Sequence, residues 1–247
     1  MSEIEVNREG TVALITLAAP DRRNTFTPAM VAELLAVCDD VDGDPALGAA
    51  VIKAKGDSFC AGAHRDLLAE VGHDPLSDAN YGALGLTYRA FVRVGELAVP
   101  SVAAVRGHAV GAGVNLMLAT DLRIVSNGAR IISGFRRIGL HPGGGHFVLL
   151  GRSGSREAVA ALGLFGVEID GRRAAEIGLA WEALPEEEVE PRALQLATEV
   201  SADPALARAT VKSFRLELGP PIAPWRVGLE AERAAQMWSL RRRDDAT

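Results

Sequence analysis

Two short segments of this chain are rich in glycine and alanine, and small residues let a backbone approach a ligand closely. One segment is Phe59–Ala63 and the other is Gly107–Gly113. A helix is expected from Gly113, so the amide just before it would add the positive end of a helix dipole. This pattern suits a ligand oxygen that carries negative charge. The alternative is that Gly111, Ala112 and Gly113 only allow a helix to pack tightly on a strand.

Two histidines could supply acid–base chemistry near these segments. His64 directly follows the first segment, and His141 lies within a third glycine-rich segment, Gly139–Gly145. An imidazole with its ordinary pKa near 6.5 can both take and give a proton at neutral pH. Histidines at such places are as often structural as catalytic. Arg136 and Arg137 could bind a substrate carboxylate, although a solvated or subunit-interface role is the alternative.

The elements that would position these residues alternate between strand and helix along the first two thirds of the chain. Thr27 is expected to cap a helix that begins at Pro28 and ends near residues 42–43. Residues 67–81 have no clear period and are expected to form a mobile loop or lid. Alternating strands and helices indicate a parallel sheet with crossover helices. Strands are expected at 4–6, 12–17, 49–53, 99–105 and 121–125, and helices at 84–97, 114–120, 156–165, 170–177, 191–202, 204–218 and 227–240.

Composition and charge narrow the class of protein. The chain has 247 residues, 48% of them hydrophobic and 23% charged, which is ordinary for a globular enzyme. The net charge of −6 argues against nucleic acid as the main partner. Cys38 and Cys60 form no metal-binding or disulfide pattern, so a cytoplasmic, reducing setting and no metal are expected. The acidic start shows no signal-peptide pattern, and no apolar run approaches the ~20 residues that cross a membrane.

Six segments in this order resemble the crotonase (enoyl-CoA hydratase/isomerase) superfamily. Their shared features are short motifs built on glycine, proline and alanine, matched well over residues 12–181 and loosely beyond. The resemblance implies an α/β fold with a crotonase-like ββα spiral core at 1–180 and a helical C-terminal trimerisation or lid region at 181–247. The segments are Pro20–Leu34, Phe59–Ala63, Pro100–Gly113, Asp121–Ile124, Gly139–Gly145 and Ala174–Ala180.

The resemblance also implies a site for an acyl-coenzyme-A thioester. Ala63 and Ala112 match the two positions whose backbone N–H groups stabilise the thioester oxygen as charge develops on it. Arg22 or Arg23 could bind the CoA phosphates, because guanidinium groups pair well with phosphate. Coenzyme A would be part of the substrate, with no separate cofactor. Backbone contacts to CoA are expected around Cys60, Ala61, Gly62 and Gly111.

The sequence departs from the family where hydratases carry two catalytic glutamates. Asn115 stands at the first position and Phe135 at the second. Asparagine can orient a water or a carbonyl but cannot take a proton at neutral pH, and phenylalanine does neither. Ordinary hydration is therefore not expected, and the acid or base would be another group, with His141 and His64 as candidates.

Three functions remain open from the sequence. The first is an acyl-CoA enzyme with lyase, decarboxylase or hydrolase chemistry, since loss of CO2 forms the enolate without a protein base. The second is an acyl-CoA-binding protein without catalysis, and the third is a conventional hydratase whose glutamates lie elsewhere. The resemblance implies a homotrimer or hexamer, a place in fatty acid metabolism, and no nucleic-acid or membrane partner.

Overall fold

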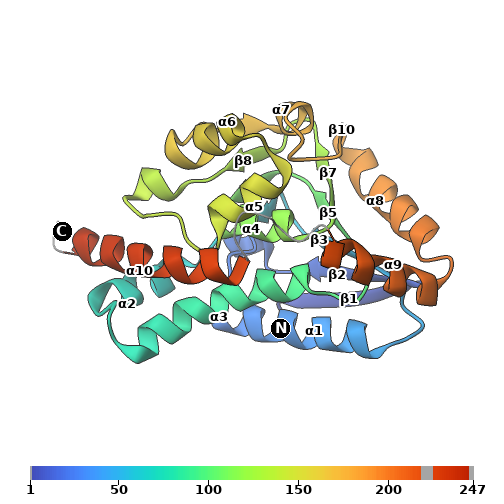
Figure 1. The fold of residues 1–247 in the computed structure, drawn as a ribbon, viewed down its shortest axis with the longest axis horizontal. Helices are drawn as coiled ribbons and strands as arrows, with labels where there is room; N and C mark the ends of the chain where they lie inside the picture. The colour runs from blue at the N-terminus through green and yellow to red at the C-terminus, as the bar shows by residue number, and fades with distance from the viewer. Residues whose placement is uncertain (1, 218–224, 245–247) are drawn as a thin grey trace.

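The computed structural model describes residues 2–217 and 225–244, which form two β-sheets surrounded by helices (Figure 1). The large sheet has the order β1-β2-β3-β5-β7-β10, and the small sheet has the order β4-β6-β8-β9. Within the large sheet only the β1–β2 pair is antiparallel. The strands are β1 (Ile4–Glu9), β2 (Val12–Leu17), β3 (Ala49–Ala54), β4 (Ser58–Cys60), β5 (Ser101–Val105), β6 (His108–Val110), β7 (Leu122–Ser126), β8 (Arg130–Ile132), β9 (Ile169–Asp170) and β10 (Glu182–Leu184).

Three neighbouring strands of the large sheet are each followed at once by a strand of the small sheet. β3 leads into β4, β5 into β6 and β7 into β8, and a helix follows each pair. The chain thus repeats a ββα unit, and the repeats stack side by side because β4, β6 and β8 pair in parallel. This is the crotonase-type ββα spiral that the sequence predicted.

The helices largely confirm the expected positions. Thr27 caps α1 by accepting a hydrogen bond from the Met30 amide at 3.1 Å, as its spacing predicted. The helix expected at 156–165 is a short α-helix continued by a π-helical turn, and α5 was not predicted. The helices are α1 (Pro28–Gly43), α2 (Arg65–His73), α3 (Asp78–Gly95), α4 (Ala112–Ala119), α5 (His146–Ser153), α6 (Arg156–Val159), α7 (Gly171–Glu176), α8 (Glu186–Val200), α9 (Pro204–Glu217) and α10 (Trp225–Asp244), with short turns η1 (Pro20–Arg22), η2 (Phe135–Ile138) and η3 (Ala160–Leu164).

The mobile loop predicted for residues 67–81 is wrong. Helix α2 covers most of this range, and α3 begins at Asp78. Local side chains start both helices: His64 caps α2, and Ser77 caps α3 by accepting from the Asn80 amide. The period was hard to see because α2 buries only Leu67, Val71 and Gly72, a narrow stripe.

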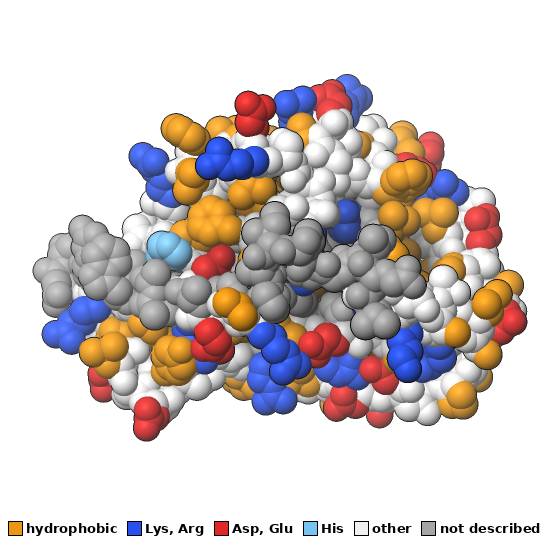
Figure 2. Space-filling model, in the orientation of Figure 1, with side chains coloured by type: hydrophobic (Ala, Val, Ile, Leu, Met, Phe, Trp, Pro, Cys, Tyr) orange, Lys and Arg blue, Asp and Glu red, His pale blue; other side chains and the backbone are white. Residues whose placement is uncertain are grey.

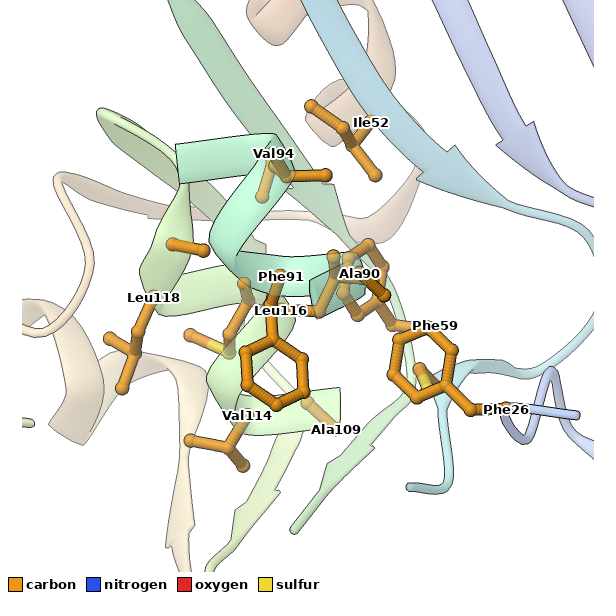
Figure 3. Packing of buried hydrophobic residues seen from close by; sticks show 14 of the residues in the cluster. Phe26, Ile52, Phe59, Ala90, Phe91, Val94, Ala109, Val114, Leu116 and Leu118 are labelled. Carbon is orange, nitrogen blue, oxygen red and sulfur yellow. The ribbon is translucent and has the colours of Figure 1, made fainter. Parts of the chain in front are cut away.

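The two faces of the large sheet have separate cores, since successive side chains of a strand point to opposite faces. Val51, Val102 and Ala104 pack against α8 on one face. Ile52, Ala103 and their neighbours join the main core, which continues through α1, α3 and α4. Figure 3 shows the part of this core where aromatic rings meet apolar side chains of α4.

The C-terminal helix α10 lies along α2 and α3, at the other end of the molecule from α8 (Figure 1). Basic and acidic side chains are interspersed over the face drawn in Figure 2. No helix in residues 2–217 and 225–244 combines the length and apolar character that crossing a bilayer needs.

Candidate functional site

The carboxyl ends of three neighbouring strands meet at one edge of the small sheet. β4 pairs in parallel with β6, with Cys60 opposite Ala109, and β6 pairs in parallel with β8. Ala63 is three residues after Cys60, and Ala112 is three residues after Ala109. Equal spacing from paired residues places the two alanines at the same edge. The register of the small sheet therefore brings together two residues that are 49 positions apart in the sequence.

The backbone N–H of Ala63 is left without an acceptor by the way its turn is held. Phe26 donates its N–H to the Gly62 carbonyl at 2.8 Å and accepts the N–H of His64 at 3.0 Å. These two bonds form a parallel bridge between Phe26 and Ala63 that uses the neighbours of Ala63 and not its own amide. In the described part of the chain, this N–H is available to a ligand.

The N–H of Ala112 is available for a different reason. Ala112 is the first residue of α4, and the first amides of a helix have no partner within it. Gly111 precedes it with φ of 53°, a left-handed conformation that favours glycine, and donates to the Ile132 carbonyl at 2.9 Å. The Ala112 N–H also lies at the positive end of the α4 dipole.

The two turns are in backbone contact. A Cβ atom built on Gly62 would lie 2.8 Å from the Val110 carbonyl oxygen and 3.5 Å from the Ala112 nitrogen. A Cβ atom built on Gly113 would lie 2.0 Å from the Cys60 carbonyl oxygen. Only glycine allows this approach, so the tight helix–strand packing that was the alternative in the sequence is present. The same packing places the Ala63 and Ala112 amides on adjacent turns, and neither has an acceptor among the residues that the structure describes.

Asn115 lies one helical turn beyond Ala112 and belongs to a buried chain of hydrogen bonds. Its Nδ2 donates to the Gly143 carbonyl at 2.9 Å. Its Oδ1 lies 2.7 Å from His146 Nδ1, and His146 Nε2 lies 2.8 Å from Ser133 Oγ. The side chains come from α4, from the start of α5 and from the residue after β8, and all three are buried.

The partners assign the protons in this chain. The Gly143 carbonyl only accepts, so the Asn115 amide nitrogen must face it and Oδ1 must face His146. His146 therefore carries its proton on Nδ1, and its Nε2 accepts from the Ser133 hydroxyl. Burial lowers the pKa of His146 from 6.5 to about 3, so the ring is neutral at physiological pH. Phe135 stacks edge-on against this ring with the centroids 5.0 Å apart.

A carboxylate that the sequence analysis missed lies beside this chain. Glu232 of α10 is buried and accepts the backbone N–H groups of His146 at 2.9 Å and Phe147 at 3.3 Å. It caps α5, which has no side-chain cap of its own because Gly145 precedes it. Desolvation raises the pKa of Glu232, although these backbone hydrogen bonds oppose the shift. No sequence signal distinguished it, because the buried face of α10 carries Glu232 and Gln236 beside Leu229, Met237 and Leu240.

Replacing Glu232 by alanine should lower the free energy of unfolding by about 1–3 kcal/mol, because two buried N–H groups lose their acceptor. Urea unfolding at pH 7 measures the loss. Glu230→Ala is the matched control on the same helix: Glu230 is exposed and pairs with Arg233 at 3.0 Å, so a change within about 1 kcal/mol is expected there. Equal losses in the two variants would contradict the capping role.

The two histidines proposed for acid–base chemistry have local partners. His64 is half-buried and accepts the Asp66 amide at 3.3 Å as the cap of α2. His141 Nδ1 donates to the carbonyl of the adjacent Pro142 at 2.6 Å. His141 is partly exposed and close enough to Glu232 to interact with its charge. Their catalytic roles stay predictions.

Five of the six residues predicted to bind CoA lie in the first turn and at residues 60–62, and the sixth, Gly111, precedes α4. Arg22 forms an ion pair with Glu3, whereas Arg23 is exposed and its carbonyl accepts the Ala61 amide at 3.0 Å. Cys60 is fully buried, and burial raises the pKa of its thiol to about 12. Any contact from Cys60 to a ligand would therefore come from its backbone.

Asn24, which the sequence motif contained without a role, ties these turns together. It is buried with φ of 53°, accepts the Ala19 amide at 2.8 Å, and donates to the carbonyls of Lys55 and Ser58 at 2.9 and 2.8 Å. One side chain thus fixes the first turn against the strand that leads to Ala63. Asparagine suits this place because it tolerates the left-handed conformation and offers both donors and an acceptor.

Arg136 and Arg137 lie in η2, and both side chains are exposed to solvent. Arg137 pairs with Glu168 at 3.0 Å, and the Arg136 side chain approaches the Leu164 carbonyl at 3.4 Å. Both line a small hollow that also includes Ser133.

Comparisons with known proteins agree with this architecture. A sequence model described as enoyl-CoA hydratase/isomerase matches residues 7–221. A probable enoyl-CoA hydratase of Mycobacterium tuberculosis is 36% identical over 93% of this chain and 86% of its own length. The 1,2-epoxyphenylacetyl-CoA isomerase of Escherichia coli is 30% identical over 83% and 78%.

Solved structures share the fold. A putative enoyl-CoA hydratase/isomerase from Acinetobacter baumannii has a TM-score of 0.87 at 21% identity, covering 99% of this chain and 96% of that one. An enoyl-CoA hydratase from Bacillus halodurans has the same TM-score at 23% identity and covers both chains completely. The chain therefore belongs to the enoyl-CoA hydratase/isomerase family.

Proposed function

We propose that this protein is an acyl-CoA-processing enzyme that holds a thioester oxygen between the N–H groups of Ala63 and Ala112. The observation that carries the proposal is that two amides, without acceptors in residues 2–217 and 225–244, lie on touching turns at adjacent strand ends. Such donors stabilise an enolate or other oxyanion more strongly as charge develops, which lowers the barrier to reaction. The relatives' names refer to enoyl-CoA or to another acyl-CoA, and this supports the substrate class.

The proton chemistry must differ from hydration by two glutamates. Asn115 cannot take a proton, and Phe135 packs on the His146 ring. We therefore favour lyase, decarboxylase or hydrolase chemistry. In decarboxylation the bond from the α carbon to the carboxylate breaks, and CO2 leaves. The electron pair of the broken bond stays with the α carbon and forms the enolate, whose oxygen the two amides bind. A proton then adds to the α carbon, and His141 is our candidate donor.

Two other functions follow from specific observations. A neutral His146 and an amide at residue 115 leave the site poor in bases, which suits a protein that binds acyl-CoA without converting it. A conventional hydratase would need a carboxylate elsewhere, and Glu232 is the one buried carboxylate among the residues that the structure describes. Its carboxylate is engaged by the start of α5, which argues against that role.

The remaining contacts and the assembly belong to the same proposal. Arg22 or Arg23 would bind the CoA phosphates, and the backbone of Cys60, Ala61, Gly62 and Gly111 would line the CoA and thioester site. The exposed position of Arg23 favours it over Arg22, which already pairs with Glu3. We also propose a homotrimer or hexamer in the cytoplasm.

A panel of acyl-CoA thioesters tests the proposal. Malonyl-CoA should be converted to acetyl-CoA or to free CoA, as followed by chromatography, while crotonyl-CoA should not be hydrated. His141→Ala should reduce this turnover by about 100-fold if His141 donates the proton. Ready hydration of crotonyl-CoA would identify a conventional hydratase. Calorimetric binding of acyl-CoA without conversion of any thioester would identify a binding protein.

A further inference from the structure

The buried chain of Ser133, His146 and Asn115 has no part in the oxyanion site. We propose that Ser133 and His146 are positioning residues that fix the Asn115 amide as a hydrogen-bond donor to the acyl group. The substrate class that fits this donor is an acyl-CoA with an oxygen acceptor on the second carbon beyond the thioester carbonyl, which is an α-carboxy (malonyl-type) or a β-oxo thioester. This inference rests on the proposed acyl-CoA function and names its substrate class.

The chain permits one orientation of the Asn115 amide. Rotation of the amide by 180° would place Oδ1 against the Gly143 carbonyl and Nδ2 against the Nδ1–H of His146. Both hydrogen bonds, at 2.9 and 2.7 Å, would be replaced by repulsive contacts. Ser133 fits this arrangement, because its hydroxyl, 2.8 Å from His146 Nε2, can donate to the nitrogen that is left unprotonated when Nδ1 carries the proton. The Gly143 carbonyl and the His146 ring thus decide which amide atom is a donor, and Ser133 satisfies the other ring nitrogen.

One hydrogen of the Asn115 amide remains without an acceptor. Nδ2 carries two hydrogens, and among the residues that the structure describes only the Gly143 carbonyl accepts one of them. Asn115 is 1% exposed, so this second N–H is withdrawn from bulk water. A buried donor without a partner is costly, and a bound ligand that offers an acceptor removes that cost.

The position of Asn115 directs this donor toward the acyl group. Side chains of a helix lean toward its N-terminus, so Asn115 covers the turn that begins at Ala112. A thioester oxygen held by the Ala112 amide brings the next carbons of the acyl chain to this side of α4. Phe91 lies close by, because a Cβ atom on Gly144 would lie 2.7 Å from its ring and 2.9 Å from Asn115 Nδ2. These apolar neighbours strengthen a hydrogen bond by excluding water.

An oxygen acceptor and an alkyl group of the same shape should therefore bind differently. An alkyl chain leaves the second Asn115 N–H unpaired, and a site with an unpaired buried donor rejects such a ligand strongly. Where a glutamate-based hydratase has a carboxylate that accepts a proton, this chain has the Asn115 amide, which donates a hydrogen bond. A hydrogen-bond donor at this position selects for an acyl group that carries an oxygen acceptor.

Calorimetric titration with two ligands of similar shape tests the inference. Acetoacetyl-CoA carries an oxygen where isovaleryl-CoA carries a methyl group, and free CoA reports the rest of the site. The wild-type protein should bind acetoacetyl-CoA at least about 10-fold more tightly than isovaleryl-CoA. Asn115→Leu and His146→Leu should abolish that preference, while the Kd of free CoA stays the same. His146→Gln should retain the preference for acetoacetyl-CoA, because glutamine can donate to Asn115 and accept from Ser133.

A merely structural role for His146 would weaken both acyl-CoA ligands by the same factor, so an unchanged ratio in His146→Leu would overturn the inference. Ser133→Ala provides a milder test if His146→Leu does not fold, and it should reduce the ratio. Covalent acylation of Ser133, detected by mass spectrometry, would also overturn it by making Ser133 a nucleophile. Failure to bind either thioester or free CoA would instead refute the acyl-CoA function itself. Turnover of malonyl-CoA together with binding of acetoacetyl-CoA would support the α-carboxy thioesters as the substrates within this class.

Discussion

Gly113→Ala should lower acyl-CoA turnover, measured as kcat/KM on the most active thioester, by about 100-fold or more. The added Cβ atom would lie 2.0 Å from the Cys60 carbonyl oxygen, a distance that no real contact allows. Both atoms belong to backbone or are fixed to it, so no flexible side chain can move aside. α4 and β4 must separate by about 1 Å to restore ordinary contact. That separation moves the Ala112 amide away from the turn that carries Ala63.

A matched glycine on another helix provides the control for this variant. Gly151 lies within α5, and a Cβ atom there meets no atom within 4 Å. Gly151→Ala should keep full activity and stabilise the protein by about 0.5–1 kcal/mol, since alanine favours a helix over glycine. Should Gly113→Ala retain wild-type kcat/KM, the proposed pairing of the two amides would be wrong. If the protein only binds acyl-CoA, the same comparison applies to its Kd.

The close contact between the turns at Gly62 and Gly113 left a visible mark on the sequence, because this contact depends on the backbone. Small residues at 59–63 and 107–113 are required wherever two turns touch, and this requirement is visible as glycine and alanine at fixed positions. Thr27 and Pro28 likewise predicted the start of α1 through local capping chemistry. Features set by neighbours in the chain, or by the close approach of backbones, leave a direct mark on residue type.

The polar chain behind Asn115 could not be predicted, because it depends on side chains far apart in the sequence. Ser133 and His146 are unremarkable residues until β8 and the start of α5 are placed against α4. Glu232 comes from α10, 86 positions after the amide of His146 that it accepts. His141 attracted attention as a histidine in a glycine-rich segment, while His146, five residues later, makes the buried contacts. Residue type alone does not distinguish the two, since burial decides which histidine is fully shielded from water.

The helices at 65–73 and 78–95 show a second limit. Residues 67–81 have no clear apolar period, and Gly72 lowers the helix propensity within this range. Helix α2 forms there because His64 caps its start and Leu67 and Val71 pack into the core. The lack of a period therefore hid a helix that buries only a narrow stripe, whereas the short apolar segment that forms α4 was recognised.

The free energy of unfolding should fall as the pH is lowered below about 6.5, and His146 should account for much of this loss. Its folded-state pKa is lowered to about 3, so below pH 6.5 the unfolded chain binds a proton that the folded protein excludes. The stabilisation is fully present above pH 6.5 and is lost at about 1.4 kcal/mol per pH unit down to about pH 3. Between pH 6.5 and 4.5 the expected loss is about 2–3 kcal/mol.

Urea unfolding of the wild type and His146→Gln at pH 4.5–8 isolates this contribution. Glu232 acts in the opposite direction: its pKa is raised in the folded state, so its contribution declines as the pH rises above about 4.5. Both proteins retain Glu232, and the difference between their unfolding free energies therefore reports mainly the histidine. That difference should be constant above pH 7.5 and shift in favour of His146→Gln as the pH falls. A constant difference down to pH 4.5 would mean that the folded protein accommodates a protonated His146, and the proton assignment that fixes the Asn115 amide would then be wrong.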